Sequence, residues 1–404
     1  MVNPKRPSVA LVCDWLIGTG GAERVVLELH KLYPEAPIYT SQYDKRPSAW
    51  HGENWFADAD VRTGWLNKLP KSLRKFLPLA RAWYFSHLDL SEYDLVISSS
   101  GAEAKGVKTS SWALVDSRWA QFKKRVLKAS GLSTAYHLPS TKATHIAYVH
   151  SPTHYYWVRY DEYLKNPGFG WLDPLARLGL KLLVGPLRRW DYKAAQRPDY
   201  IVTNSKHTKE MIKKFYNRAA EVIHPPVDTE RFAKKADELR RGFVTAGRQT
   251  PYKRIDLVVE AFNQLDLPLL VLGNGPDHKR LERLAGRKIT FIKNPSDTDM
   301  AHYFKTSLAF ILPNLDDFGI VAVEALSAGT PVIAYKAGGA LDYVIPAKTG
   351  LFFDKQTPAS LAKAVKDFSA TSFDNDYIQN FSQNFSAQSF RHSLKAFVSK
   401  ITLE

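Results

Sequence analysis

The stretch from Leu315 to Ala334 constrains the fold more than any other part of the chain. It sets two acids, Asp316 and Glu324, eight residues apart, and between them lie a Phe-Gly loop and an apolar run. We expect a helix over 320–328, which a Gly-Thr-Pro sequence ends before a strand over 332–335. The loop, helix and strand together predict one unit of an α/β fold.

The two acids have different predicted surroundings. Glu324 lies inside the apolar helix, where a carboxylate is costly unless a partner hydrogen-bonds to it. Asp316 lies just upstream, near the free N–H groups and the positive end of the same helix. Because a helix of eight residues rises ~12 Å, two such acids can hold two hydroxyl-bearing parts of one long ligand. A buried acid that caps a neighbouring loop is the structural alternative.

Length and composition favour two cytoplasmic domains. The chain has 404 residues, 45% of them hydrophobic, which is enough for two cores of comparable size. Its one cysteine, Cys13, excludes a disulfide framework and a thiolate metal cluster, and we expect it to be a small buried residue at a strand end. The first residues carry no apolar signal core, and no segment approaches ~18 uninterrupted apolar residues.

Charge points to anionic partners. Lys and Arg exceed Asp and Glu by 56 to 40, a net charge of +16, which favours nucleic acid, anionic lipid or phosphorylated small molecules. Two segments, Leu66 to Phe85 and Leu172 to Trp190, mix basic with large apolar residues. This mixture suits an amphipathic segment on an anionic membrane, and an ordinary surface helix would explain it equally well.

Short apolar strands alternate with helices along both halves of the chain, which predicts parallel sheets covered on both faces. We expect strands at 8–13, 94–98, 145–149 and 200–203 in the first half, and at 242–246, 267–272, 289–292, 308–312 and 332–335 in the second. The adjacent prolines within Val222 to Asp228 predict the hinge. The predicted domains are therefore 1–221 and 222–380, with a helical end-piece at 381–404, and a ligand cleft at the carboxyl ends of the strands.

Three loops follow predicted strands and carry residues suited to anions or sugars. Gly20 and Gly21 open the helix after the first strand, where backbone can approach an anion closely, although Glu23 breaks the dinucleotide fingerprint. The loop Gly247-Arg248 with Lys253 can neutralise a diphosphate leaving group. His150 ends another strand and can donate a hydrogen bond to a sugar or phosphate. No histidine spacing suggests a metal site.

Taken together, these blocks resemble a retaining glycosyltransferase of family 4, with the GT-B fold. The resemblance covers nearly the whole chain and includes Gly20-Gly-Ala-Glu-Arg24, Val149-His-Ser-Pro152, His224-Pro-Pro-Val-Asp228, Gly247-Arg-x-x-x-Tyr-Lys-Arg-Ile-Asp256 and Asp317-Phe-Gly-Ile-x-x-Val-Glu-Ala325. It implies an acceptor-binding N-terminal domain, a donor-binding C-terminal domain and a reaction without a metal or other cofactor. In its Gly-Gly-Ala-Glu-Arg and His-Ser-Pro motifs the chain resembles bacterial mannosyltransferases of surface polysaccharide assembly, which makes GDP-mannose the first donor to expect.

The resemblance also implies a role for each matching residue. Arg248 and Lys253, with Gly247, would hold the donor diphosphate, and Glu324 would bind the ribose. Asp316 with the amides of Phe318, Gly319 and Ile320 would hold the donor sugar. Gly20 and Gly21 would approach the donor phosphate and the acceptor, and His150 would assist near the reacting sugar. The expected acceptor is a glycan or a polyprenyl-linked glycan, and the expected location is the cytoplasm, peripheral on the inner face of the cell membrane.

Two departures from the family stand out. The paired-acid motif usually begins with Glu, whereas this chain has Asp316, which is one methylene shorter. This difference puts the hydrogen bonding to the donor sugar, and so the donor's identity, in question. An insert at about 110–142, rich in Trp, Lys and Arg, separates two blocks that lie close together in the related chains. We interpret the insert as an aid to docking a lipid-linked acceptor, with an ordered surface excursion as the alternative.

Two competing functions share part of this pattern. A UDP-sugar 2-epimerase has the same two-domain architecture but needs no acceptor, so epimer formed from nucleotide sugar alone would favour it. A non-enzymatic adaptor for membranes or nucleic acid is compatible with the net charge. No aromatic-basic module or helix-turn-helix supports nucleic-acid binding, and we expect no nucleic-acid partner.

Overall fold

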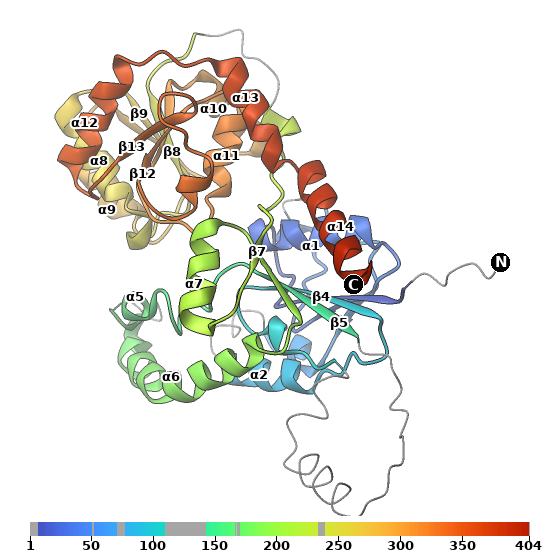
Figure 1. The fold of residues 1–404 in the computed structure, drawn as a ribbon. Coiled ribbons are helices and arrows are strands. Elements are labelled where there is room, and N and C mark those ends of the chain that lie inside the picture. Colours follow the sequence, from blue (N-terminus) through green and yellow to red (C-terminus); the bar gives the residue numbers. More distant parts are fainter. Residues whose placement is uncertain are drawn as a thin grey trace, which may run out of the picture. The chain divides into compact units, whose positions relative to one another are not determined.

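A computed structural model describes residues 7–50, 52–70, 77–109, 143–165, 167, 170–232 and 239–403 of the chain. The predicted insert at 110–142 lies outside the described residues, as do 71–76 of the first basic amphipathic segment. The chain divides into two compact units, Met1–Asn204 with Lys209–Val222, and Ser205–Thr208 with Ile223–Glu404. Each unit has its own parallel sheet (Figure 1). Among the described helices, none combines the length and the apolar character needed to cross a membrane.

The described part of the first unit contains a seven-stranded sheet in the order β3-β2-β1-β4-β5-β6-β7. All neighbours pair in parallel, and β1 aligns Val9 with Leu95 and Cys13 with Ser99 of β4. The order reverses between β1 and β4, so their carboxyl ends flank the switch point of the sheet. The strands are β1 (Val9–Cys13), β2 (Ile38–Thr40), β3 (Val61–Thr63), β4 (Leu95–Ser100), β5 (Thr144–Val149), β6 (Tyr200–Thr203) and β7 (Glu221–Val222).

Amphipathic helices bury their apolar sides against this sheet. In α1, Val25, Val26 and Leu29 are buried, as the 3.6-residue period requires. Pro78 begins α2, where the missing N–H costs nothing, and Phe85 from that helix enters a core cluster with Ala10 and Val96. The helices are α1 (Gly21–Leu32), α2 (Pro78–His87), α5 (Tyr160–Lys165), α6 (Asp173–Ala195) and α7 (Lys206–Tyr216).

The described part of the second unit repeats this plan with six parallel strands in the order β10-β9-β8-β11-β12-β13. Its switch point falls between β8 and β11, where Ala309 and Phe310 of β11 pair with Phe243 and Val244. The strands are β8 (Phe243–Ala246), β9 (Leu269–Leu272), β10 (Ile289–Ile292), β11 (Ala309–Leu312), β12 (Val332–Tyr335) and β13 (Gly350–Phe353).

Two apolar clusters cover the two faces of this second sheet. One cluster joins the sheet to α8, α9 and α12 through residues such as Phe262 and Leu361, and the other joins it to α10, α11 and α13 through Phe304, Leu326 and Ile378. Helices α10 and α12 start at side-chain caps, Ser296 and Thr357. The helices are α8 (Ile255–Leu265), α9 (His278–Leu284), α10 (Asp297–Thr306), α11 (Ile320–Ser327), α12 (Pro358–Ser369), α13 (Asn375–Ser382) and α14 (Ala387–Leu403).

The predicted α/β fold class, with two doubly wound parallel sheets, is confirmed. Predicted strands at 200–203, 289–292 and 332–335 match the observed bounds, and α11 ends one residue before its predicted end. Four short strands, β2, β3, β7 and β13, were not predicted. β2, β3 and β7 have only two or three residues, too few to show a period in the sequence, and β13 has four.

Candidate functional site

The second unit gathers its predicted site residues at the switch point of its sheet. Gly247 and Arg248 directly follow β8, and Asp316 lies in the loop between β11 and α11. Because parallel strands end at one edge, loops after neighbouring strands β8 and β11 lie side by side. Arg248 is exposed at this edge. The architecture therefore explains why residues 68 positions apart in sequence can serve one ligand.

Lys253 and Asp316 form a close ion pair at this edge. The ammonium Nζ of Lys253 lies 2.8 Å from Oδ1 and 2.7 Å from Oδ2 of Asp316, and the Asn314 amide donates to Oδ1 at 2.7 Å. The side chains are 23% and 16% exposed, so both remain in reach of a ligand. Lys253 lies outside the next helix, α8. It ends a separate 3₁₀ helix, Pro251–Lys253, because Arg254 adopts a left-handed conformation before α8.

Glu324 is buried within α11 and has the partner that its burial requires. Its Oε1 accepts a hydrogen bond from Nη2 of Arg231 at 3.2 Å, and Nη1 of the same guanidinium pairs with Asp297 at 2.5 Å. The Glu324 side chain is 8% exposed. Arg231 thus bridges one nearly buried and one exposed acid, which offsets the cost of placing Glu324 in an apolar helix.

The start of α11 is a crowded turn that admits only glycine at position 319. Gly319 has φ +94, and a Cβ there would lie 2.5 Å from the Tyr343 hydroxyl. Gly319 precedes Ile320, the first residue of α11, so the first free N–H groups of the helix begin here. The Phe318 side chain is buried against His224, Tyr343 and Phe385. Phe318 can therefore offer a ligand its backbone amide but not its ring.

Two further glycines let the loops after β8 and β9 touch. Gly247 has φ +146 and Gly273 has φ +110, a region that favours glycine. A Cβ on Gly273 would lie 2.5 Å from the carbonyl oxygen of Gly247, and the Gln249 side-chain amide donates to the Gly273 carbonyl at 2.9 Å. Gly273-Asn274-Gly275 is therefore a tight turn that supports the Arg248 loop.

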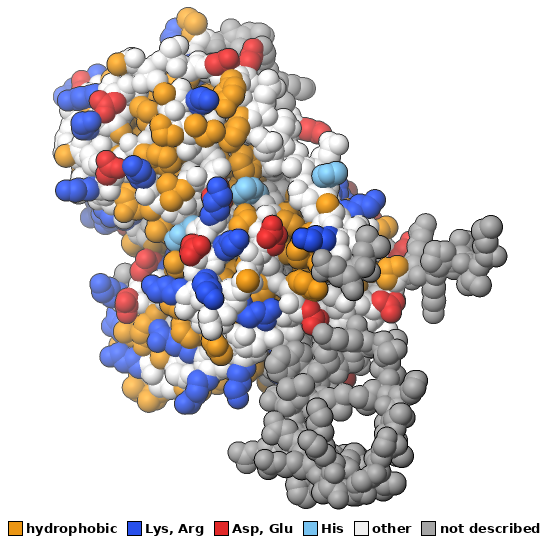
Figure 2. Space-filling model, in the orientation of Figure 1, with side chains coloured by type: hydrophobic (Ala, Val, Ile, Leu, Met, Phe, Trp, Pro, Cys, Tyr) orange, Lys and Arg blue, Asp and Glu red, His pale blue; other side chains and the backbone are white. Residues whose placement is uncertain are grey.

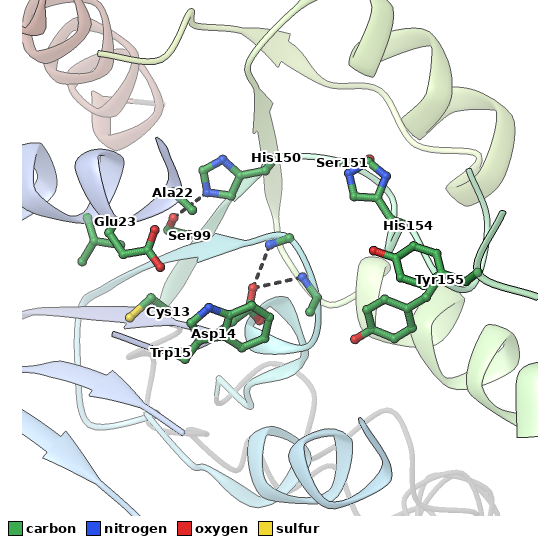
Figure 3. Close-up of a pocket in the computed structure, with 14 residues that line it drawn as sticks. Cys13, Asp14, Trp15, Ala22, Glu23, Ser99, His150, Ser151, His154 and Tyr155 are labelled. Carbon is green, nitrogen blue, oxygen red and sulfur yellow. Dashed lines mark hydrogen bonds between the residues drawn. The ribbon is translucent and has the colours of Figure 1, made fainter. Parts of the chain in front are cut away.

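The first unit has a cavity of about 280 Å³ at its own switch point, lined by both polar and apolar side chains (Figure 3). Loops after β1, β4 and β5 and the first turns of α1 form its walls. Its lining includes Asp14, Trp15, Ala22, Glu23, Ser99, Gly101, His150, His154, Tyr155 and Tyr163. The carboxylate, hydroxyl, imidazole and phenol groups among these side chains can hydrogen-bond to a polyhydroxylated molecule.

His150 lines this cavity, as its place at a strand end predicts. Its Nε2 lies 2.8 Å from Oγ of Ser99, its backbone N–H donates to Ser100 at 3.0 Å, and its carbonyl accepts from Asn204 at 2.8 Å. The ring is thus held by Ser99 of β4, and the backbone of His150 is held from β4 and from the loop after β6. Gly20 and Gly21 lie beside the cavity, since Ala22 lines it. Gly20 has φ −172, extended backbone that does not itself require glycine.

Asp14 positions the loop after β4, a role that the sequence did not reveal. Its carboxylate accepts hydrogen bonds from the N–H groups of Gly101, Ala102 and Ala104 at 2.7 to 3.0 Å. Burial, with the nearby charge of Glu103, raises the pKa of Asp14. Burial also raises the pKa of Cys13, so this thiol stays neutral and is the small buried strand-end residue that we predicted.

Several site residues were missing from the sequence-based set. Glu23, Ser99, His154 and Tyr155 all line the cavity of the first unit, and Asn314 and Arg231 hold the two acids of the second. Position after a strand was the one available signal, and it applies to Ser99 and Asn314 as it did to His150. Among the residues that the structure describes, no group of three or more His, Cys, Asp or Glu side chains is arranged to hold a metal ion.

Comparison with known proteins agrees with this geometry. Residues 226–385 match the family described as Glycosyl transferases group 1. The chain is 27% identical over 177 residues to an uncharacterised glycosyltransferase of Methanocaldococcus jannaschii, covering 43% of this chain and 50% of that protein. It is 26% identical over 234 residues to the GDP-mannose-dependent alpha-(1-6)-phosphatidylinositol monomannoside mannosyltransferase of Mycolicibacterium smegmatis, covering 50% of this chain and 58% of that protein. The chain thus spans about half the length of the curated relatives it matches.

The fold has solved counterparts along nearly its whole length. The Anabaena protein HepE, in a crystal structure with UDP, aligns with a TM-score of 0.64 and 16% identity, covering 97% of this chain and all of HepE. Two Rossmann-like units with this likeness define the class as GT-B. Within that class, residues 226–385 are the part of the chain that is similar to the Glycosyl transferases group 1 family.

Proposed function

We propose that this protein is a retaining glycosyltransferase that moves a hexose from a nucleotide sugar to a glycan or lipid-linked acceptor. One observation carries the proposal. In the second unit, Arg248 and Lys253 lie at the same sheet edge as Asp316, and Glu324 follows on α11. Two cations suit a diphosphate and two acids suit hydroxyl groups, within the segment that matches the glycosyltransferase family.

The proposed roles follow from the chemistry of each group. Arg248 and Lys253 neutralise the diphosphate as the bond between sugar C1 and phosphate oxygen breaks. Asp316, with the amides of Gly319 and Ile320, holds sugar hydroxyls, and Glu324 binds the nucleotide ribose. The acceptor hydroxyl forms its bond to C1 on the face that the diphosphate leaves, and its proton passes to the departing phosphate oxygen. Stabilising that leaving group is the largest contribution expected of the protein.

The pairing of Lys253 with Asp316 fits this scheme. In the ion pair the ammonium proposed to bind the diphosphate is held against the acid proposed to bind the sugar. Lys253 can therefore orient Asp316 and bind phosphate with separate N–H groups, because an ammonium has three donors. Asp316 is one methylene shorter than the Glu expected from the family, and the Asn314 amide fixes its carboxylate.

The first unit is proposed to bind the acceptor. Its cavity presents His150, Glu23 and Ser99, groups that hydrogen-bond to sugar hydroxyls. GDP-mannose is the donor that we propose, since a matched relative is named as GDP-mannose-dependent. We propose a role in cell-surface polysaccharide assembly at the inner face of the cell membrane. We also propose that the reaction needs no metal, because Arg248 and Lys253 provide the charge that a cation would otherwise supply.

The test is a transfer assay with radiolabelled GDP-mannose and an extract of lipid-linked glycans, in buffer containing EDTA. We expect label in the lipid fraction, with the anomeric configuration of the donor preserved in the product. Lys253→Ala should lower turnover by ~100-fold, on the scale of losing one group that stabilises a leaving anion. Lys288→Ala is the matched control, because Lys288 also pairs with an aspartate, Asp266, at 2.7 Å but precedes β10.

Three results would contradict the proposal. These are an inverted product, equal turnover of the Lys253 and Lys288 variants, or a requirement for added divalent metal. Epimer formed from a UDP-sugar alone, without acceptor, would favour the epimerase instead.

A further inference from the structure

Gln249 follows Arg248 directly in the loop after β8, and its side chain has a different environment. Gln249 is fully buried, whereas Arg248 is exposed, so one side chain faces the protein interior and its neighbour faces solvent. None of the roles proposed above uses Gln249. Because the two residues share a peptide unit, whatever fixes Gln249 also limits the direction in which Arg248 leaves the loop.

The backbone holds the loop after β8 against the loop after β9. The N–H of Gly247 donates to the Leu272 carbonyl at 3.1 Å, and the N–H of Gln249 donates to the Asn274 carbonyl at 2.9 Å. The side-chain Nε2 of Gln249 adds a hydrogen bond to the Gly273 carbonyl at 2.9 Å. These bonds leave Oε1 of Gln249 as the end of its amide that reaches beyond the two loops.

His278, the first residue of α9, contacts that end of the Gln249 side chain. Nδ1 of His278 lies 2.6 Å from Oε1 of Gln249, and Nε2 lies 2.9 Å from Oε1 of Glu282, one turn further along α9. The imidazole is 7% exposed and packs against the edge of Phe291, with ring centroids 5.5 Å apart. A chain of three side chains thus runs from the surface of α9 to the Arg248 loop.

Both ring nitrogens of His278 face oxygen atoms that accept hydrogen bonds. A carbonyl oxygen cannot donate, so the Gln249 amide must present Nε2 to Gly273 and Oε1 to His278. Desolvation raises the pKa of Glu282, but hydrogen bonds and charges from Lys293 and His278 outweigh it and lower that pKa, so Glu282 is a carboxylate. A neutral imidazole has one N–H and an imidazolium has two, so only the charged ring can donate to both partners.

Charged residues beside this pair have partners of their own. Lys293, which follows β10, pairs with Glu282 at 3.3 Å, and Asp277 pairs with Arg280 at 2.7 Å. Figure 2 shows basic and acidic side chains interspersed over the face of the second unit where α8, α9 and α12 lie in Figure 1. That face therefore has no strong field of one sign, and Glu282 is the charge that favours the imidazolium form of His278.

We propose that Gln249 and His278 are positioning residues for Arg248, and that the imidazolium of His278, paired with Glu282, fixes the loop that receives the donor diphosphate. The proposal rests on the proposed function, which gives Arg248 a diphosphate to bind. A neutral ring would place a nitrogen lone pair 2.9 Å from the Glu282 carboxylate. The ring must then move away, and its contact with Gln249 moves with it. The loop keeps its backbone hydrogen bonds but loses its side-chain anchor, so Arg248 becomes less ordered and binds the diphosphate more weakly.

The experiment measures the order of the Arg248 loop first without a ligand and then with one. Hydrogen exchange at the amides of Gly247 and Gln249 is followed in the full chain at about pH 5.5 and about pH 8.5, and is corrected for the intrinsic exchange rate at each pH. We expect wild-type protection to fall by about fivefold at the higher pH, because the loop opens locally. Calorimetric titration of GDP-mannose, whose diphosphate does not titrate in this range, should show weaker binding at the higher pH.

Two substitutions separate the charge of the chain from its packing. Glu282→Gln offers an amide N–H to Nε2 of His278, so a neutral ring can satisfy both partners. We expect this variant to keep the wild-type protection of low pH at both pH values. Gln249→Leu breaks the chain within a similar volume and should give low protection at both. The matched control is Glu260→Gln, which removes an exposed carboxylate from α8 and should keep the wild-type pH dependence.

The proposal is overturned if wild-type protection is equal at the two pH values. It is also overturned if Glu282→Gln keeps the pH dependence of the wild type or loses protection at both pH values, since the charge of His278 would then not fix the loop. Failure of the proposed function looks different. If exchange follows the prediction but neither GDP-mannose nor UDP-glucose gives heat, the role of His278 in fixing the loop stands and the donor assignment falls. Donor binding with pH-independent protection removes the role of His278 and leaves the donor site standing.

Discussion

At the scale of single residues, Lys253 is held at the proposed donor site by an ion pair with Asp316. Its ammonium contacts both carboxylate oxygens of Asp316. Without Lys253, Asp316 would keep the Asn314 amide but would face a donor diphosphate as an uncompensated negative charge. The pair therefore explains how an acid can stand next to the proposed diphosphate position at all.

His145 makes stability depend on pH through its burial. It is fully buried at the start of β5, beside Ser98 Oγ at 2.9 Å, and burial lowers its pKa from 6.5 to about 4. Asp199 opposes this shift, and Arg197 and Arg218 add to it. The folded state thus binds fewer protons than the unfolded state between these two pKa values, so stability is present above pH 6.5 and falls as the pH drops toward 4.

We predict that the unfolding free energy of the first unit falls by about 2 kcal/mol between pH 7 and pH 5 through His145 alone. Urea unfolding at both pH values, monitored by a spectroscopic probe in the first unit, measures this change in the unfolding free energy. His145→Gln cannot take up the proton, and its pH-dependent loss should be smaller by that amount. The assignment to His145 fails if the variant and the wild type lose equal stability over this interval.

At the scale of elements, α11 and the loop before it form the most constrained segment of the second unit. Gly319 begins the turn at φ +94, Gly338 and Gly339 approach the same loop, and the Gly339 N–H donates to the Asp316 carbonyl at 2.9 Å. The loop is fixed from two directions. Its backbone amides can then stay in place for a ligand without an ordering cost on binding.

We predict that Gly319→Ala destabilises the protein by ~1–3 kcal/mol, because it combines a strained φ with a Cβ only 2.5 Å from the Tyr343 hydroxyl. It should also weaken donor binding about tenfold, since the amides of this turn move. Gly52→Ala is the control, at φ +122 with nothing within 4 Å of the new Cβ. Both variants should unfold earlier in urea, and a donor affinity equal in the two would contradict the role given to the Gly319 turn.

The sequence predicted those elements whose signals are local. The helix after Asp316 and the strands of both switch points have long apolar runs with clear turn residues, and their bounds were nearly right. The acids Asp316 and Glu324 were found because acids in apolar runs are rare. The partner of Glu324, Arg231, was missed because it lies 93 residues away and their contact depends on a tertiary distance that no spacing in the sequence reports. Asn314 lies only two residues from Asp316, and its place after a strand was a signal that we did not use.

The basic amphipathic segments show the same limit. Arg81 was predicted on a basic face, but it is buried and paired with Glu103. In α6, the guanidinium of Arg177 donates to the carbonyls of Leu164 and Lys165, which ties α5 to α6. The sequence shows how many cations these segments carry, but not which of them bind groups within the protein and which face solvent.

At the scale of the whole molecule, the two units carry different parts of the proposed chemistry. The first has a cavity at its switch point whose lining includes His150, Glu23 and Ser99, and the second has cations and acids at its switch point. Both use the same strand order, so both place their loops at the carboxyl edge of a parallel sheet. Repetition of one architecture therefore provides two separate binding sites, one proposed for each substrate.

The most direct test of this division is a calorimetric titration of GDP-mannose, with UDP-glucose for comparison, into the wild type and the variants Arg248→Ala and Glu324→Gln. We predict saturable binding of GDP-mannose, weakened at least tenfold by each substitution, because each removes a charged contact to the nucleotide sugar. Arg287→Ala, an exposed arginine before β10, should bind as the wild type does. Absence of heat with both nucleotide sugars, or equal binding by the Arg248 and Arg287 variants, would contradict the account.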